Sequence, residues 1–418
     1  MADTQGCPVL DTDFTVTNPN FINDPFADYD WMVERPIWRD PVTNFWVVTR
    51  YEDVRSIALD HGTWSNRASQ IFNRTSSVAE QIKQMYETGG WLPMDTLVSN
   101  DQPEHKFYRA LVDKALTPAR VKTIIPFIDA AVDRLTTAML QKGTFDFIHD
   151  FAVQLTMTML ANQVGGAGPE DVNYIRRKTD FSMEAIDPTL APDREVFIAG
   201  ELIEFQHYMA RKIEEVRQHP TDTILSSLVH ADVDGRQLTV QEIIAIATQF
   251  FGAGHDTTTS ALGSSMRYLA EHPEALALLK ANPEKIPNFV EEMLRLEAPI
   301  QRLVRRAIKD TEIGGVAIKE GEIALIQWGG ANRDAARFSC PHAMDIERAD
   351  ANRHLTFGSG IHLCIGNQLA RAELRSAIAA ITARCGSISL AKGVDSYRYY
   401  PLFIARALAR LDVVVTPA

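Results

Sequence analysis

The sequence predicts a mainly α fold with small β-sheets (α+β), formed as a single domain over residues 1–418. Long helical patterns occupy most of the chain, and short runs of β-forming residues lie mainly within 20–65, 300–330 and 385–418. The chain is 45% hydrophobic and 23% charged, which is ordinary for a globular protein with a large core. Length alone would allow two or three domains, but no Pro/Ser/Gly-rich linker or charge run divides the chain. We therefore expect one large folded unit.

One helical segment is long enough to cross the whole domain. It opens with a capping box, Thr239 followed three residues later by Glu242, and its pattern continues until His272 and Pro273 stop it. Roughly 32 residues at ~1.5 Å each give a rod of about 48 Å, so we expect this helix to be central. The predicted long helices together cover residues 119–141, 147–163, 194–218, 240–271, 285–296 and 366–383.

Three short segments are predicted to form strands. Residues 45–50 (FWVVTR) are rich in β-forming side chains, and residues 411–415 have the same character. Residues 316–327 contain two short apolar runs split by K-E-G at 319–321, which predicts a β-hairpin. We expect these strands to form small sheets at the flanks of a helical body.

The charge and the apolar pattern exclude some classes of partner. The chain has 54 acidic and 42 basic residues, a formal charge of −12, without blocks of one sign. This balance promotes solubility and disfavours nucleic-acid binding. The N-terminus lacks the basic start and apolar block of a signal peptide, and the most apolar helical stretch, 243–251, is too short to span a bilayer. We expect a cytoplasmic monomer that binds neither nucleic acid nor membrane.

The cysteines are widely spaced and form no C-x-x-C pair, which argues against a disulfide framework and against a zinc site. Reduced thiols are therefore expected. The four are Cys7, Cys340, Cys364 and Cys385.

The most informative segment is 357–366, F-G-S-G-I-H-L-C-I-G, which a helical run follows at once. Its three glycines around one cysteine indicate a tight loop whose backbone approaches something flat and bulky. Cys364 would lie at the N-terminus of the next helix, where the positive end of the helix dipole stabilises a thiolate. An anionic sulfur ligand suits the iron of a haem. The alternative is an inert buried cysteine in a turn.

This segment resembles the haem-binding loop of the cytochrome P450 family, whose pattern is F-x-x-G-x-[R/H]-x-C-x-G. The matching residues are Phe357, Gly360, His362, Cys364 and Gly366. The resemblance implies a single cytochrome P450-like domain with haem b, its iron ligated by Cys364, and the long central helix over the haem. His362 stands where many members have arginine. The further cofactor contacts implied in this loop are Phe357, Gly358, His362 and Gly366.

A second group of residues interrupts the apolar pattern in the middle of the long helix. The run 253–258, A-G-H-D-T-T, places Gly, Asp and Thr, all poor helix formers, at interior positions. Such side chains can bond to nearby carbonyls or water and form a polar notch. A surface-exposed kink is the alternative.

The run resembles the family's A-G-x-[D/E]-T, which passes over the distal face of the haem. The resemblance implies that Asp256 and Thr257 are the catalytic relay that brings protons to oxygen, and that Ala253 and Gly254 contact the cofactor. Cleavage of an O–O bond needs protons while bulk water is excluded. The acid–alcohol pair also favours O2 plus electrons over the peroxide used by one branch of the family. His255 lies at a variable position, and we expect it to be packed or linked to solvent.

Glu292 and Arg295 form an i, i+3 pair on a predicted helix, which alone would be a weak exposed ion pair. The pair resembles the family's E-x-x-R, and Arg348 has the place of the arginine that completes a triad with it. The resemblance implies a structural brace on the haem-binding side of the core.

Haem carries two propionates, which need cationic or hydrogen-bonding partners where they are partly buried. His105 and Arg109 match the family's H-x-x-x-R near the propionates, and Arg305 matches the arginine on the strand after the E-x-x-R helix. His362 matches the partner two residues before the cysteine. Each of these residues, taken alone, could also be an ordinary surface charge.

The resemblance implies a haem-dependent monooxygenase that inserts one atom of O2 into a C–H bond (hydroxylation) or a C=C bond. Without a clear charged anchor, we expect a largely apolar substrate of the terpenoid, steroid or aromatic class, with Gln301 as a hydrogen-bond partner for a polar end. The alternatives are a non-catalytic haem-thiolate sensor or carrier, and a helical scaffold without cofactor. The candidate pocket residues are Gln249, Gly252, Ala253, Gln301, Val304 and Ile404.

The sequence contains no flavin or iron–sulfur motif, so electrons are expected from separate proteins. By analogy with the family, these would be a ferredoxin and an NAD(P)H-dependent ferredoxin reductase. A basic patch near the thiolate could receive the ferredoxin. The residues predicted to form it are Arg353, His354, Arg371 and Arg375.

Overall fold

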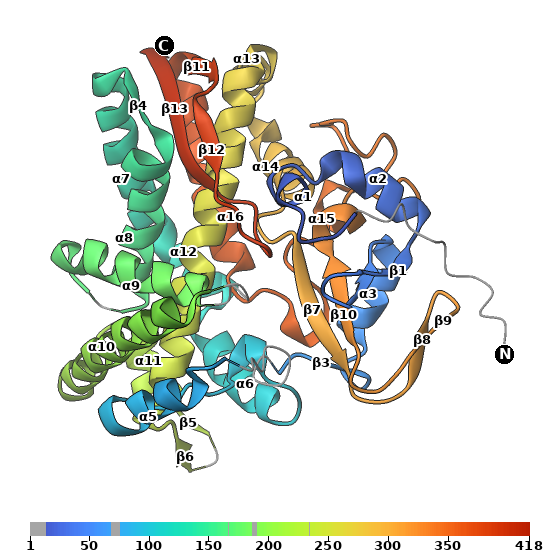
Figure 1. The fold of residues 1–418 in the computed structure, drawn as a ribbon. Coiled ribbons are helices and arrows are strands. Elements are labelled where there is room, and N and C mark those ends of the chain that lie inside the picture. Colours follow the sequence, from blue (N-terminus) through green and yellow to red (C-terminus); the bar gives the residue numbers. More distant parts are fainter. Residues whose placement is uncertain (1–13, 68–75, 166, 186–189, 234) are drawn as a thin grey trace, which may run out of the picture.

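The computed structural model describes residues 14–67, 76–165, 167–185, 190–233 and 235–418. Helices form most of this part of the chain, and the sheets are small, as the sequence predicts (Figure 1). The α-helices are α1 (Pro19–Asn23), α2 (Phe26–Glu34), α3 (Tyr51–Leu59), α5 (Ala79–Gly89), α6 (Glu104–Ala115), α7 (Pro118–Lys142), α8 (Val153–Gln163), α9 (Val172–Glu184), α10 (Pro192–Gln218), α11 (Ile224–Val229), α12 (Val240–Glu271), α13 (Pro273–Ala281), α14 (Ile286–Leu296), α15 (Trp328–Ala331) and α16 (Asn367–Arg384).

Each predicted long helix is present, and several short turns of helix connect them. The predicted helix over 147–163 begins as a π-helical turn, η2 (Ile148–Ala152), before α8 continues it. The remaining short turns are 3-10 helices: η1 (Leu97–Ser99), η3 (Pro169–Asp171), η4 (Pro283–Lys285), η5 (Ala351–Arg353) and η6 (Gly360–His362).

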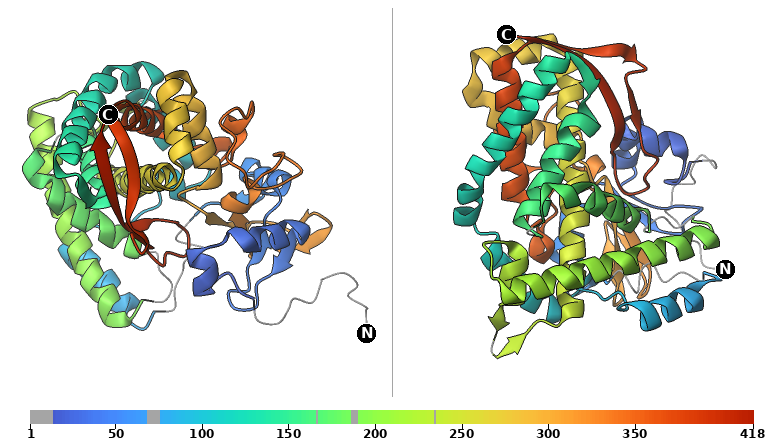
Figure 2. Two further views of the ribbon diagram at one scale, coloured as in Figure 1. Left: turned by 90° about the horizontal axis from the view of Figure 1, so that it is seen from above. Right: turned by 90° about the vertical axis from the view of Figure 1, so that its left-hand side faces the viewer.

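The 32-residue helix α12 runs through the middle of the helical part (Figure 1). Its predicted capping box is formed, because Glu242 N donates to Thr239 Oγ1 (3.2 Å) and Thr239 N donates to Glu242 Oε2 (2.8 Å). It ends at Glu271, and Pro273 starts α13. Helices α8, α9, α10 and α16 pack against it, and α10 crosses it steeply (Figure 2). The prediction of a central helix is confirmed. No helix in the described ranges is long and apolar enough to cross a membrane.

The strands are β1 (Ile37–Arg39), β2 (Trp46–Val48), β3 (Trp64–Ser65), β4 (Thr144–Asp146), β5 (Asp232–Val233), β6 (Arg236–Gln237), β7 (Arg302–Ala307), β8 (Thr311–Ile313), β9 (Val316–Ile318), β10 (Ile323–Gln327), β11 (Cys385–Val394), β12 (Tyr397–Tyr399) and β13 (Leu408–Pro417). Five of them form a sheet in the order β1-β2-β10-β7-β3. Strand β13 pairs with β11, β12 and β4 in a second sheet.

The strand predicted over 45–50 is present in its middle part as β2, and the strand predicted over 411–415 lies within β13. The hairpin predicted over 316–327 is wrong. Its two halves are strands, but β9 pairs with β8, whereas β10 pairs antiparallel with β7 and parallel with β2. Both strands therefore take partners from outside the predicted segment.

The five-stranded sheet has an apolar cluster on each face. Because successive side chains of a strand point to opposite faces, Val47 and Leu325 belong to one cluster and Val48 and Ile326 to the other. Val304 of β7 lies on the Leu325 side. The largest core lies among the helices and includes residues of α7, α8, α12 and α16.

Candidate functional site

Cys364 lies in a tight loop between η6 and α16. Its backbone N–H donates to the carbonyl of Phe357 (2.9 Å), which closes the loop. Gly358 and Gly360 have φ angles of 71° and 72°, the left-handed region that favours glycine. A Cβ on Gly360 would also lie 2.6 Å from the carbonyl oxygen of Ala58. The backbone conformation of this loop therefore favours glycine at 358 and 360, as the pattern predicts.

The backbone at the start of α16 directs hydrogen-bond donors toward the Cys364 sulfur. Burial raises the pKa of this thiol above its usual value and outweighs the N–H groups of Gly366 and Asn367 and the charges of Arg109 and Arg371, which act to lower it. These donors and charges would stabilise the anionic sulfur once a metal cation displaced its proton. The loop therefore fits a thiolate that binds a metal cation, because metal coordination deprotonates a thiol.

The other described cysteines have different surroundings. Cys385 begins β11, is fully buried, and its pKa is raised to about 11 by burial. Cys340 is exposed. Cys7 lies outside the described residues. Of the three described cysteines, Cys364 is the one whose thiol faces the backbone N–H groups of a helix N-terminus.

Four predicted propionate partners come together beside this loop. The rings of His105 (α6) and His362 (η6) have centroids 4.4 Å apart, and each has a buried Nδ1 with no hydrogen-bond partner among the described residues. Burial, and then the charges of Arg305, His105 and Arg109, lower the pKa of His362 to about 3. Burial lowers the pKa of Arg305 to about 10, and its Nη1 donates to the carbonyl of Val304 (2.8 Å). Converging buried donors of this kind fit the two carboxylates of a haem.

The nearest acids are engaged elsewhere. Asp101 accepts hydrogen bonds from Ser65 Oγ (2.6 Å) and Asn66 N (2.8 Å). Asp113 accepts from Arg109 Nε (2.8 Å), whose Nη1 also reaches the carbonyl of Leu363 (2.7 Å). Arg109 thus ties α6 to the cysteine loop.

Sequence reasoning missed His61, which follows α3. Its charge contributes to the lowered pKa of both His105 and His362, so it lies close to them. No motif in the sequence marks this residue.

The polar run of α12 divides between two faces of the helix. Ala253 is exposed and Thr257 is half-buried one turn later, and the Thr257 hydroxyl donates to the Ala253 carbonyl (2.6 Å). α12 stays α-helical throughout, so the polar notch consists of side chains. Gly254 lies toward α8, where an added Cβ would be 2.9 Å from Leu160 Cδ2. The need for glycine at 254 therefore comes from helix packing.

Asp256 and His255 lie where α12 meets α8 and α9. Burial, and then the charge of Asp180 on α9, raise the pKa of Asp256 to about 7 against the opposing charge of Arg176. His255 is buried, with its Nδ1 2.9 Å from Thr156 Oγ1. His255 is therefore packed, as expected.

The predicted triad is formed and buried. Glu292 Oε1 accepts from Arg295 Nε (2.6 Å) and Arg348 Nε (3.0 Å), and Glu292 Oε2 accepts from Arg295 Nη2 (2.9 Å). Arg295 and Arg348 also donate to loop carbonyls, including those of Asn332 and Ser339. The triad holds the connection before the cysteine loop to α14.

The basic patch predicted for a ferredoxin is partly neutralised by one carboxylate, that of Glu291. Arg371 donates to both carboxylate oxygens of Glu291 (2.7 and 2.8 Å), and Arg375 and His354 lie 3.1 and 3.2 Å from the same group. Burial raises the pKa of Glu291, but the hydrogen bonds from His354 and Arg371 outweigh it and lower that pKa to about 2. His354 is itself buried, and Arg353 remains exposed. The prediction of this patch did not take Glu291 into account.

Two predicted pocket residues belong to the core instead. Gln301 is 1% exposed, its Oε1 accepts from Tyr29 Oη (2.5 Å), and its Nε2 donates to the Ala298 carbonyl. Its amide is therefore fully used within the protein. Val304 packs in the apolar cluster on the face of β7 opposite Arg305. Leu303, which is half-buried, shares the face of Arg305, and strand alternation from Arg305 would have favoured it.

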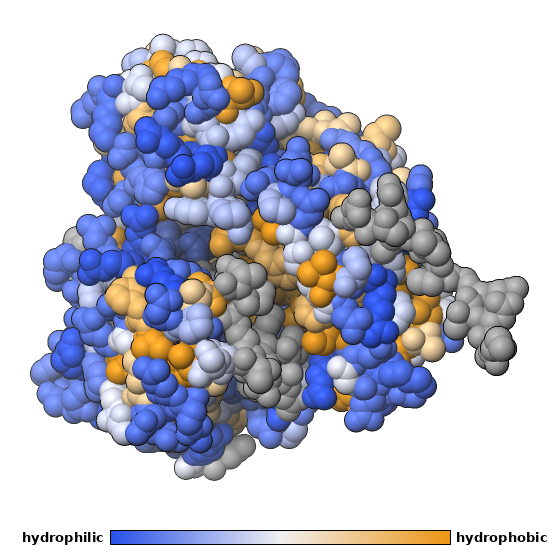
Figure 3. Space-filling view, in the orientation of Figure 1, coloured by the Kyte–Doolittle hydropathy of each residue, from blue (hydrophilic) through white to orange (hydrophobic). Residues whose placement is uncertain are grey.

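The remaining predicted pocket residues have varied surroundings. Gln249 Nε2 donates to Thr96 Oγ1 (2.8 Å) and its Oε1 accepts from Val98 N (3.2 Å), so it joins α12 to η1. Val98 is 52% exposed beside it. Gly252 is buried, whereas Ile404 is half-buried. The space-filling view shows a recess between the helical and β-rich sides, edged in part by apolar residues (Figure 3).

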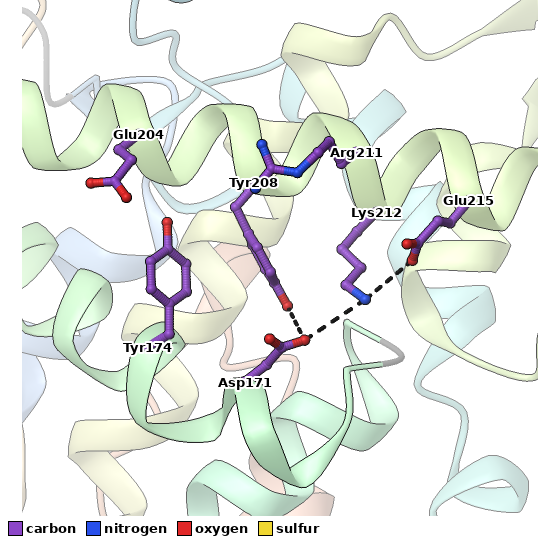
Figure 4. Close-up of a pocket in the computed structure, with 7 residues that line it drawn as sticks. All are labelled: Asp171, Tyr174, Glu204, Tyr208, Arg211, Lys212 and Glu215. Atoms are coloured by element: carbon purple, nitrogen blue, oxygen red, sulfur yellow. Dashed lines mark hydrogen bonds and ion pairs between the residues drawn. The ribbon is translucent and has the colours of Figure 1, made fainter.

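A separate polar cavity of about 450 Å³ lies on α9 and α10 and contains none of the predicted site residues (Figure 4). Asp171 accepts from Tyr208 Oη (2.9 Å) and lies 3.7 Å from Lys212 Nζ. Asp171 thus joins η3 to α10.

A mainly α fold, a thiol loop before α16 and a central helix with one polar run are together typical of haem-thiolate proteins. Residues 187–387 match the family model described as Cytochrome P450. Cytochrome P450 107B1 of Saccharopolyspora erythraea is 31% identical over 94% of this chain and 95% of its own. Vitamin D(3) 25-hydroxylase of Pseudonocardia autotrophica is 31% identical over 94% and 97%.

A solved structure, P450BioI in complex with hexadec-9Z-enoic acid ligated Acyl Carrier Protein, has a TM-score of 0.85 and 32% identity. It covers 95% of this chain and all of the other chain. The chain therefore belongs to the cytochrome P450 family of monooxygenases, which use haem b with a cysteine thiolate ligand and O2.

Proposed function

We propose that this chain binds haem b through Cys364 and inserts one atom of O2 into a C–H or C=C bond of a largely apolar small molecule. The observation that carries the proposal is the meeting of two features. The N–H groups of Gly366 and Asn367 face the Cys364 sulfur, and buried donors without partners on His105 and His362 lie beside the same loop. One ligand with a metal and two carboxylates would satisfy both.

Residues of the chain have separate roles in this proposal. His105, Arg109, Arg305 and His362 hold the propionates, and Cys364 holds the iron. Bound haem would supply the activation of O2 and the transfer of one oxygen atom.

Asp256 and Thr257 supply protons in this proposal. Because the pKa of Asp256 is about 7, its carboxyl can hold a proton at neutral pH and release it on demand. The Thr257 hydroxyl, on the exposed side of α12 with Ala253, can pass a proton across that face. A sensor or carrier has no use for a proton donor of this kind, so this pair favours turnover.

An apolar substrate of the terpenoid, steroid or aromatic class is proposed for two reasons. The accessible side chains near α12 include Val98 and Ala253, which are apolar, and Gln301 is unavailable to a polar group. The name of the similar vitamin D(3) 25-hydroxylase also specifies a largely apolar molecule, and the chain of the hexadecenoic acid that is ligated to acyl carrier protein in the P450BioI complex supports the apolar character alone.

The test is a library of such compounds added to the purified haem protein, with the low-spin to high-spin shift of the haem spectrum as readout. Apolar compounds should give saturable shifts. If only charged compounds shift the spectrum, the proposed substrate class is wrong.

A ferredoxin and an NAD(P)H-dependent reductase are proposed as electron donors. Leu363, next to the ligand cysteine, is 43% exposed, and Arg353 is exposed on the same stretch of chain. Arg353→Glu should slow reduction by a ferredoxin at low salt, measured by stopped flow, whereas Arg398→Glu on β12 should not. Equal rates for both variants would contradict this docking surface.

A further inference from the structure

Helix α9 places a second carboxyl beside the relay acid of α12. Ligand-type atoms of Asp180, His255 and Asp256 all lie within 4.8 Å of one another, and His255 Nε2 is 3.6 Å from Asp256 Oδ1. The side chains become less accessible along the group: Asp180 is 49% exposed, Asp256 30% and His255 3%. These three side chains thus extend from solvent into the contact between α9 and α12.

His255 is held at its Nδ1 atom, which lies 2.9 Å from the Thr156 hydroxyl and 3.4 Å from the Thr259 hydroxyl. These two hydroxyls are 3.0 Å apart. Burial lowers the pKa of His255 to about 3, so the imidazole is neutral, and its Nε2 atom faces Asp256.

Two carboxyls and one neutral imidazole are therefore held together with little positive charge. Arg176 lies 3.9 Å from Asp180, and His149, which is paired with Asp146, adds a weaker influence on Asp180. Like charges at this distance favour a proton on one of the two acids. Burial and the neighbouring Asp180 both raise the pKa of Asp256, and burial raises that of Asp180.

We propose that Asp180 is a positioning residue of the proton relay, which keeps Asp256 protonated at neutral pH and reloads it from solvent while α9 lies against α12. The inference rests on the proposed role of Asp256. In each reloading step a proton leaves the Asp180 carboxyl for the Asp256 carboxylate, and water returns a proton to Asp180. No electrons move, and one proton is taken from bulk solvent.

The position of Asp180 depends on how α9 is held. Lys178 of α9 is buried and bonds to Glu201 (2.9 Å) and Glu204 (2.6 Å) of α10. Asp171, just before α9, accepts from Tyr208 of α10 (2.9 Å). Asp171 therefore supports the same helix pair without reaching α12, and it provides a matched control.

The experiment uses the holoprotein, a compound that gives the spin shift, and surrogate ferredoxin and reductase. The fraction of electrons recovered as product is measured against pH for wild type, Asp180→Asn, Asp180→Glu and Asp171→Asn. A relay that needs protonated Asp256 works below its pKa and fails as pH rises through it. Asparagine removes the like charge and leaves Arg176 unopposed, so the pKa of Asp256 should fall.

The midpoint of the pH profile should therefore move down by roughly 0.5–1 pH unit in Asp180→Asn, with more peroxide at neutral pH. Asp180→Glu should restore the wild-type profile, and Asp171→Asn should leave it unchanged. An unchanged midpoint in Asp180→Asn, or an equal shift in Asp171→Asn, would overturn the inference.

Failure of the inference about Asp180 can be distinguished from failure of the proposed function. If Thr257→Ala uncouples the enzyme while Asp180→Asn behaves as wild type, only the role of Asp180 is lost. If the wild-type protein lacks the thiolate-ligated ferrous carbonyl spectrum, the proposed function itself fails.

Discussion

The imidazole rings of His105 and His362 lie with their centroids 4.4 Å apart and their planes tilted by 59°, although they come from α6 and from the cysteine loop. Both Nδ1 atoms are buried without a partner among the described residues. Buried polar groups are rarely left unbonded, so this pair indicates an acceptor from outside the chain.

His105→Ala should weaken haem retention. Loss of one hydrogen bond to a charged group costs about 1.5–3 kcal/mol, which corresponds to roughly a tenfold or greater rise in haem loss. Transfer of haem to excess apomyoglobin measures the rate. The control is His219→Ala, an exposed histidine after α10, which should lose haem as slowly as wild type. Equal rates in the two variants would contradict a propionate role.

Glu292→Gln should destabilise the fold strongly. The substitution leaves the buried guanidinium groups of Arg295 and Arg348 without their counter-charge, at a cost of about 3–5 kcal/mol. Urea unfolding followed by circular dichroism gives the free energy of unfolding. Lys319→Ala, which breaks an exposed ion pair with Asp310, should leave the unfolding midpoint unchanged. A similarly small effect for Glu292→Gln would show that the triad is no brace.

Thr257→Ala should keep the haem spectrum and divert electrons from product to peroxide. The methyl group cannot pass a proton, while the helix and the thiol loop remain intact. The ratio of peroxide formed to NAD(P)H consumed measures this directly. Thr137→Ala is a close control, because Thr137 also donates to a carbonyl one turn earlier, that of Asp133 (2.8 Å), but on the exposed face of α7. Normal coupling in Thr257→Ala would argue against the relay.

Gly360→Ala should disturb the cysteine loop more than an ordinary left-handed glycine would suggest. The positive φ alone costs about 1–2 kcal/mol, and the new Cβ would press on the Ala58 carbonyl. Gly393→Ala has a similar φ of 56° with no atom within 4 Å of its Cβ, so it isolates the dihedral cost. The measurement is thermal unfolding together with haem content. If both variants show the same loss of thermal stability and haem content, the close approach of the new Cβ to the Ala58 carbonyl does not disturb the loop.

Much of this architecture is local enough to be predicted. The capping box at Thr239 and the stop at Pro273 fix both ends of α12, and the glycines around Cys364 specify a loop with positive φ angles. Spacing alone cannot reveal partners that are distant in sequence. Two adjacent apolar runs in the β9–β10 segment predict a hairpin, but the fold pairs β9 with β8 and β10 with β7, and the sequence does not show these pairings.

The errors in the candidate site have the same origin. Gln301 is held by Tyr29, 272 residues earlier, and Arg371 is held by Glu291, 80 residues earlier. Neither partner stands out in the sequence. Val304 is different. Side chains alternate between the two faces of β7, so the sequence itself places Leu303, and not Val304, on the same face as Arg305.

The ferrous carbonyl spectrum of the purified haem protein tests the central claim most directly. Wild type and Cys385→Ala should both show the signature of a thiolate-ligated carbonyl complex, and Cys364→Ala should lose it. Retention of that signature in Cys364→Ala, or its loss in Cys385→Ala, would contradict the assignment of Cys364 as the iron ligand.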